Sequence, residues 1–373
     1  MSENMDNYLK FLNESQKEAV EIVSGSTLVL AGAGSGKTRV LTYKLLHLLA
    51  KKILKPNQIL AVTFTNKAAL EMKSRVSKML NFPIDRMWLG TFHSLSLKIL
   101  RKHYEKINLK KNFVIIDTDD QIKLIKKICD QEKIDTKEIS PKFFASAIDN
   151  LKNKGVFSAE LKPSKYRIND EELRKVYKIY QEEMIRINCV DFGDLILLCI
   201  KLFKENEDVK KYYQNLFHFI LVDEYQDINF IQQKWLEFLY QGHKNICCVG
   251  DDDQSIYSWR GADVTNLLEF KKNFHTPKII RLEQNYRSTK NILECASVLI
   301  DKNKNRYGKK LWSENEVGDK VVINGFWETK EEAIYTTDQI EMLIEKKIQL
   351  SEIAILFRVA AHTRSFEDRL ISI

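Results

Sequence analysis

Residues 31–38 read Ala31-Gly32-Ala33-Gly34-Ser35-Gly36-Lys37-Thr38. An apolar, β-branched run over Thr27–Ala31 comes before them, and an amphipathic stretch of helical length follows as far as about Ala50. A glycine-rich turn between a strand and a helix, ending in Lys-Thr, matches the phosphate-binding loop pattern, here with alanine in place of the first glycine. This stretch therefore predicts an α/β fold built around a nucleotide site.

The residue types in this loop suit the binding of phosphate. The small residues allow successive backbone N–H groups to curl around phosphate oxygens at the positive end of the following helix. Lys37 is placed to neutralise charge on the β- and γ-phosphates, and Thr38 to offer its hydroxyl to Mg²⁺. We therefore expect ATP and Mg²⁺ as ligands, although the loop alone does not define a reaction.

Five further β-branched, apolar runs alternate with stretches of helical length. Strands separated by helices predict a mainly parallel, doubly wound sheet, as in RecA-like P-loop domains. The predicted strands are Gln58–Phe64, Met87–Phe92, Phe217–Asp223, Asn245–Gly250 and Lys278–Leu282.

The strand series is interrupted once and then starts again. The Lys- and Glu-rich region 110–188 has helical periodicity and reads as a helical insertion domain within a first motor domain, residues 1–109 and 189–280. Residues 281–373 read as part of a second α/β domain. Its predicted elements are helix Ser288–Asn303, strand Lys320–Phe326, helix Glu328–Lys346, strand Glu352–Phe357 and a final helix.

Composition excludes several classes of protein. Hydrophobic residues make up 44% of the 373, which argues against a disordered chain. No apolar run approaches the ~20 residues of a membrane helix, and the polar N-terminus lacks a signal-peptide core. We therefore expect a cytoplasmic protein without a membrane partner, whose six cysteines are buried free thiols. The formal net charge of +8 is a weak indication of a polyanionic partner.

A second motif, Phe219–Asp227, is an apolar strand that ends in acids. Its end is expected beside the phosphate-binding loop, where such sheets bind ligands. Asp223 is placed to hold Mg²⁺, and Glu224 to orient and deprotonate an attacking water. The alternative is a solvated acidic turn, but a glutamate next to the metal acid favours hydrolysis over a kinase reaction.

A third strand leads into the run Gly250–Ala262, which carries Gln254, Tyr257, Trp259 and Arg260. Gln254 could sense a γ-phosphate by hydrogen bonding. Aromatic side chains interleaved with arginine suit stacking on unpaired bases and contact with the backbone phosphates of a nucleic acid. Core packing is the alternative explanation for the aromatic residues.

This run resembles the UvrD/Rep/PcrA group of superfamily-one DNA helicases, and the resemblance continues in order from residue 12 to about residue 358. It implies that Gln16, in Leu12–Gln16, reads adenine and that Arg39 lies near the nucleotide. In Gln284–Ser288 it implies that Tyr286 stacks on adenine and that Arg287 is an arginine finger on the γ-phosphate.

The resemblance also implies a set of DNA contacts, drawn from Thr63–Ala69, Thr91–Ser94, Asp191–Leu195, the aromatic run and the predicted strand end Ile355–Arg358. Outside this context, His93 would be an ordinary structural histidine. The implied contacts are Phe64, Asn66, Thr91, His93, Phe192, Tyr257, Trp259, Arg260 and Arg358.

Members of this family move 3′ to 5′ along single-stranded DNA by hydrolysing ATP, and they unwind duplexes in repair, replication or recombination. The resemblance thus implies single-stranded DNA and duplex/single-strand junctions as partners. The chain ends before the family's last motifs, a coupling motif and a second arginine finger. An alternative is therefore a catalytically weak fragment that binds ATP and single-stranded DNA. A nucleotide kinase and a helicase–nuclease subunit are further alternatives.

Overall fold

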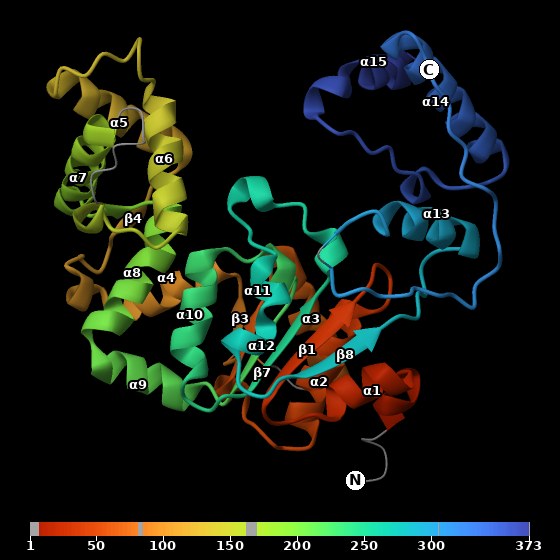
Figure 1. The fold of residues 1–373 in the computed structure, drawn as a ribbon, viewed down its shortest axis with the longest axis horizontal. Coiled ribbons are helices and arrows are strands. Elements are labelled where there is room, and N and C mark those ends of the chain that lie inside the picture. The colour runs from red at the N-terminus through yellow and green to blue at the C-terminus, as the bar shows by residue number, and fades with distance from the viewer. Residues whose placement is uncertain (1–6, 81–83, 85, 162–169, 305, 373) are drawn as a thin grey trace. The chain divides into compact units, whose positions relative to one another are not determined.

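The computed structural model describes residues 7–80, 84, 86–161, 170–304 and 306–372. Packing divides the chain into two compact units, Met1–Val317 and Gly318–Ile373. The first unit contains a six-stranded parallel sheet, which confirms the predicted α/β class (Figure 1). In spatial order its strands are β3 (Trp88–Gly90), β2 (Ile59–Val62), β6 (Phe219–Val222), β7 (Ile246–Gly250), β1 (Ser26–Ala31) and β8 (Lys278–Leu282).

The strands are apolar because helices cover both faces of the sheet. Every residue of β1, β2, β6 and β7 is buried, as expected for a parallel sheet between two helical layers. Alternate residues of β1 point to opposite faces, so Leu28 and Leu30 join one core and Val29 and Ala31 the other. The first core is completed by α4 (Phe92–Lys102), α8 (Phe192–Glu205) and α10 (Phe230–Tyr240), and the second by α1 (Glu14–Glu21), α2 (Lys37–Ala50) and α3 (Asn66–Leu80).

The helices α5 (Thr118–Gln131), α6 (Pro141–Asn153) and α7 (Asp170–Arg186) interrupt the strand series. They share a separate hydrophobic core that includes Ile125, Phe144 and Tyr180. The chain enters and leaves this region side by side, since β4 (Val114–Ile115) pairs with β5 (Cys189–Val190). The boundaries of the predicted insertion domain, 110–188, stay a prediction.

Four further α-helices complete the described part of the first unit. They are α9 (Glu207–Leu216), α11 (Thr265–Leu268), α12 (Phe270–Asn273) and α13 (Lys290–Ile300). After α13 the chain returns to the sheet, where Gln284 and Trp312 form a single parallel bridge beyond the end of β8. This return brings the segment 306–313 to the edge of the sheet that carries the predicted site.

The second unit contains α14 (Thr329–Glu345) and α15 (Arg364–Ser372), which pack through Ala333, Ile340 and Phe366. The two strands predicted here, Lys320–Phe326 and Glu352–Phe357, are wrong: the structure assigns no strand to residues 318–372. A strand requires a neighbour for its backbone hydrogen bonds, and neither segment pairs with another within the described part of this unit. Their apolar side chains are instead exposed, as Ile323 and Leu356 are.

The cysteine expectation holds in part. All six are free, and Cys129, Cys199, Cys247 and Cys248 are buried, but Cys295 on α13 is exposed and Cys189 is partly so. Among the described residues, no helix is both long and apolar enough to span a membrane.

Candidate nucleotide and nucleic-acid site

The phosphate-binding loop connects β1 to α2 with the backbone geometry that its glycines permit. Gly34 and Gly36 have φ values of 69° and 90°, in the left-handed region that favours glycine. The Ser35 hydroxyl donates a hydrogen bond of 2.7 Å to the Gly32 carbonyl, which closes the turn. Helix α2 begins at Lys37, so its free backbone N–H groups face the loop, and the partly buried Thr38 lies in its first turn.

Lys37 is the point at which three predicted catalytic residues meet. Its ammonium group donates a 2.7 Å hydrogen bond to Oε1 of Gln254 and lies 3.6 Å from a carboxylate oxygen of Glu224. A carboxylate oxygen of Asp251 is 4.0 Å away. The segments that follow β1, β6 and β7 therefore bring Lys37, Glu224 and the pair Asp251 and Gln254 to a common point at the carboxyl ends of the strands, where open α/β sheets bind ligands.

Asp223 directly follows β6 and is only 6% exposed. Burial and the neighbouring Glu224 carboxylate raise the pKa of Asp223 to about 7. Glu224 has a left-handed φ of 47°, and its N–H donates to the Asp223 carboxylate. Burial and the second acid both disfavour the negatively charged carboxylate form of Asp223. A divalent cation bound beside it would stabilise that form, so Asp223 is suited to be a Mg²⁺ ligand.

The predicted adenine contacts come from segments that are far apart in the chain. Gln16 is fully buried, and its amide nitrogen donates a 2.9 Å hydrogen bond to the Ser35 carbonyl of the loop. Asn13, the N-cap of α1, donates a 2.8 Å hydrogen bond to the hydroxyl of Tyr286. Arg39 points toward the same end of α1 and donates to the carbonyl of Phe11.

The segment after β8 contacts the phosphate-binding loop through Asn285, a residue for which no role was predicted. Its amide nitrogen donates a 2.6 Å hydrogen bond to the Ala33 carbonyl, and its amide oxygen accepts from the N–H of Arg287. The N–H of Tyr286 donates to the Gly34 carbonyl. A Cβ at Gly34 would lie only 2.8 Å from Cβ of Arg287, so this close approach requires glycine.

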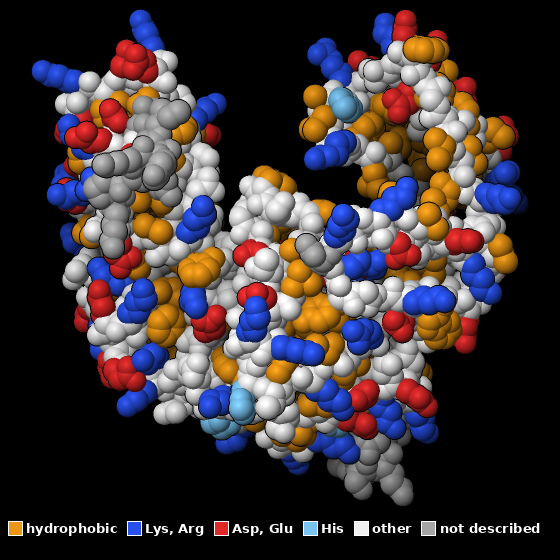
Figure 2. Space-filling model, viewed as in Figure 1, with side chains coloured by type: hydrophobic (Ala, Val, Ile, Leu, Met, Phe, Trp, Pro, Cys, Tyr) orange, Lys and Arg blue, Asp and Glu red, His pale blue; other side chains and the backbone are white. Residues whose placement is uncertain are grey.

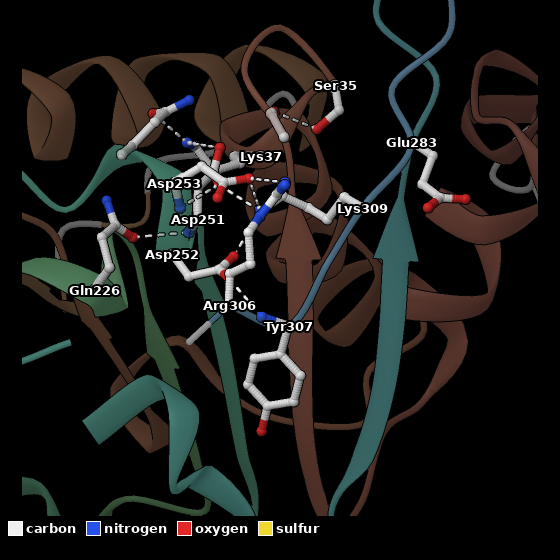
Figure 3. A network of polar contacts seen from close by, with 12 residues as sticks. Ser35, Lys37, Gln226, Asp251, Asp252, Asp253, Glu283, Arg306, Tyr307 and Lys309 are labelled. Carbon is white, nitrogen blue, oxygen red and sulfur yellow. Dashed lines mark hydrogen bonds and ion pairs between the residues drawn. The ribbon is translucent and has the colours of Figure 1, made fainter. Parts of the chain in front are cut away.

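Two basic residues that were not predicted from the sequence, Lys309 and Arg306, lie near Lys37 (Figure 3). The Lys309 ammonium contacts Asp251, Asp252 and Asp253 at 2.7, 2.6 and 2.9 Å, and its side chain is 1% exposed. Arg306 contacts Asp253 at 2.8 Å. Three consecutive acids after a buried strand were a signal that cations must lie nearby, but the local pattern did not identify them.

Six of the predicted DNA contacts line one cavity of about 460 Å³. Asp223 and Glu224 line the same cavity, so the acidic motif reaches both the phosphate-binding loop and this space. Asn66 is exposed at the start of α3 and is not part of the lining. Arg358 belongs to the second unit, so its DNA contact stays a prediction. The six are Phe64, Thr91, His93, Phe192, Tyr257 and Arg260.

The aromatic side chains at this cavity are accessible. The rings of Phe64 and Tyr257 lie 5.0 Å apart, and Trp259, 75% exposed, is 6.4 Å from Tyr257. The Arg260 guanidinium lies over the Trp259 ring at 5.3 Å. Core packing does not explain a tryptophan with this exposure. Figure 2 shows Lys and Arg side chains interspersed with Asp and Glu over the face in view.

Phe192, which is 54% exposed, is held at the first turn of α8 by a buried ion-pair network. The Lys152 ammonium on α6 contacts Asp191 at 2.5 Å and Asp194 at 2.7 Å, and none of its side chain is exposed. The Tyr180 hydroxyl on α7 also donates to Asp191. Helices of the interrupting region therefore fix the position of a residue that lines the cavity.

Comparison with known proteins agrees with this geometry. The model of the UvrD/REP helicase N-terminal domain matches residues 12–275, and that of the UvrD-like helicase C-terminal domain matches residues 280–373. A probable DNA helicase II homolog of Rickettsia felis is 45% identical over 99% of this chain, and the ATP-dependent DNA helicase PcrA of Staphylococcus epidermidis is 43% identical over 98%. The chain covers 57% and 50% of these proteins, about half their length.

Proposed function

Since the chain belongs to the UvrD/REP helicase family, we propose that it forms the ATP-hydrolysing part of a DNA helicase that moves along single-stranded DNA. One observation carries the proposal. Glu224 lies 3.6 Å from the ammonium group of the phosphate-binding Lys37, and Asp223 and Glu224 both line the aromatic cavity. A movement of Glu224 caused by nucleotide binding or hydrolysis would therefore change the lining of the cavity in which we propose that DNA binds.

For nucleotide binding, the loop N–H groups and Lys37 would hold the phosphates, and Thr38 and Asp223 would hold Mg²⁺. Mg²⁺, when bound, supplies positive charge that stabilises the oxygens of the transferring phosphoryl group. Gln16 and Tyr286, which are both hydrogen-bonded to Asn13, would recognise the adenine. Gln16 donates one of its two amide N–H groups to Ser35 and accepts from the Asn13 N–H on its amide oxygen, so its second N–H and second lone pair would serve to read a base.

For hydrolysis, Glu224 would orient and deprotonate the attacking water. Gln254, whose amide oxygen accepts from Lys37, would donate from its amide nitrogen to the γ-phosphate. Arg287, exposed beside the loop at Gly34, would stabilise the charge that develops on that phosphate. A kinase would have no need of Glu224 beside Asp223 or of exposed aromatic rings, so this alternative is disfavoured.

For translocation, Phe64, Phe192, Tyr257 and Trp259 would provide successive stacking positions for bases. Stacking on an aromatic side chain is worth about 1–3 kcal/mol per base, enough to hold a strand and small enough to release it in each ATP cycle. The 3′-to-5′ direction, action at duplex/single-strand junctions and roles in repair, replication or recombination extend the proposal on the strength of the family.

The test is ATP hydrolysis by this chain with and without an oligothymidylate, with Lys37→Ala as the control. We expect turnover that DNA stimulates and that the control lacks. Turnover unaffected by DNA would contradict the helicase proposal. Binding of labelled DNA without any turnover would support the alternative of an ATP- and DNA-binding fragment.

A further inference from the structure

Lys309 has an environment that the mechanism above does not use. It approaches the sheet from the segment after α13, and its ammonium lies among carboxylates from three successive residues (Figure 3). An ammonium group has three N–H donors, and here each of three acids lies within 2.9 Å of it. Burial alone would lower the pKa of Lys309, but these carboxylates outweigh it and raise that pKa above its ordinary value.

We propose that Lys309 is a positioning residue that holds the turn 251–254 so that Gln254 faces the nucleotide phosphates. The inference rests on the proposed function, because it gives Gln254 the task of detecting a γ-phosphate. It adds a residue outside the motifs from which that function was argued.

The turn leaves little freedom between the acids and Gln254. Residues Asp252–Gln254 form a single 3-10 turn, η6, in which the Gln254 N–H donates to the Asp251 carbonyl at 3.0 Å. The Asp251 carboxylate caps this turn by accepting from the N–H of Asp253. A shift of the carboxylates that Lys309 holds would therefore shift the Gln254 amide, which now lies 2.7 Å from Lys37.

The carboxylate of Asp251 lies between Lys309 and Lys37. One of its oxygens is 2.7 Å from Lys309, and the other is 4.0 Å from Lys37. Without Lys309, three crowded and largely buried carboxylates would repel one another, and among the described residues Arg306 and Lys37 would be left to balance them. We expect the turn to rearrange to separate these charges, which would move Gln254 away.

Neighbouring contacts tie the same segment to the chain beyond the turn. The N–H of Tyr307 donates a 2.7 Å hydrogen bond to Asp252, and its hydroxyl donates to the Leu268 carbonyl. The turn and the chain that follows the aromatic run are thus fixed by one short segment. Lys309 holds the turn through ion pairs, and Tyr307 holds it through a hydrogen bond to Asp252.

The test compares the affinity of this chain for ADP with its affinity for a non-hydrolysable ATP analogue. The variants are Lys309→Met, Gln254→Ala and the double variant, and the exposed neighbour Lys310→Met is the matched control. We expect Lys309→Met to lower affinity for the analogue about tenfold, the effect of losing one hydrogen bond to a charged group, and to change ADP affinity less than twofold. The double variant should resemble Gln254→Ala alone.

Three outcomes would overturn the inference while leaving the proposed function intact. The first is an affinity of Lys309→Met for the ATP analogue that equals that of the unaltered chain. The second is a loss of ADP affinity in Lys309→Met as large as its loss of analogue affinity, which would indicate a general structural role. The third is a double variant whose loss of analogue affinity is the product of the two single losses. The proposed function fails if the unaltered chain binds neither nucleotide, or if Lys37→Ala binds the nucleotides as tightly as the unaltered chain. The inference would then fail as well.

Discussion

The Lys37 ammonium and the Gln254 side-chain oxygen are 2.7 Å apart, although 217 residues separate them in the chain. Strands β1 and β7 are hydrogen-bonded neighbours in the sheet, so the loops that follow them share one edge. Through this contact the phosphate-binding loop is joined to the run that carries Tyr257 and Trp259.

Replacement of Lys37 should remove nucleotide binding. In Lys37→Met the only cation within 4 Å of Glu224 in the described structure is lost, and with it the charge that would face the phosphates. We expect turnover of ATP to fall by about 10²-fold or more, measured by phosphate release. Lys78→Met, an exposed lysine on α3, is the control and should keep full activity.

Trp259→Ala should weaken the binding of single-stranded DNA without affecting the fold. The side chain is 75% exposed, so its removal leaves no buried cavity. Loss of one stacking partner costs about 1–3 kcal/mol, or roughly 5- to 150-fold in Kd. Fluorescence anisotropy of a labelled oligonucleotide measures this loss, and Trp327→Ala, a fully exposed tryptophan in the second unit, is the control. Equal effects of the two substitutions would argue against a specific role for Trp259.

The raised pKa of Asp223 predicts how stability depends on pH in the absence of nucleotide. In the unfolded chain this carboxyl ionises near pH 4, whereas in the folded protein it holds its proton up to about pH 7. Its protonation therefore favours the fold at low pH, and this contribution is lost as the pH rises from about 4 to about 7.

Asp223→Asn should accordingly raise the free energy of unfolding at pH 8 by roughly 2–4 kcal/mol and change it little at pH 4. The same variant should lose Mg²⁺-dependent ATP turnover. Chemical denaturation at both pH values is the measurement. A variant that is less stable than the original protein at pH 8 would show that the carboxylate is favourably solvated.

Lys152→Met should destabilise the first unit strongly. It would leave Asp191 and Asp194 buried without their cation, a change that costs about 3–5 kcal/mol. Lys106→Met breaks an ion pair with Asp208 in which both side chains are well exposed, and should cost no more than about 1 kcal/mol. Urea unfolding of the two variants compares the buried pair with the exposed one, and similar losses would contradict the role given to Lys152.

Much of the first unit could be predicted because its signals are local. Strands β1, β2, β6 and β7 are buried along their whole length and so appear as short apolar runs, and the loop at Gly34 and Gly36 needs glycine for its own backbone angles. The second unit shows where such reasoning fails. Apolar, β-branched residues such as Val322 and Ile323 favour a strand, yet they form one only beside a partner strand.

The sequence by itself thus determined the α/β class, the phosphate-binding loop and the acids at strand ends, since each depends on residues close together in the chain. Tertiary structure alone decided which distant groups complete the site. Lys309 meets Asp252 across 57 residues, and Asn285 reaches Ala33 across 252. Local sequence can require that buried acids be neutralised, but only the packing of remote segments selects the cation, because charge compensation depends on distance in space.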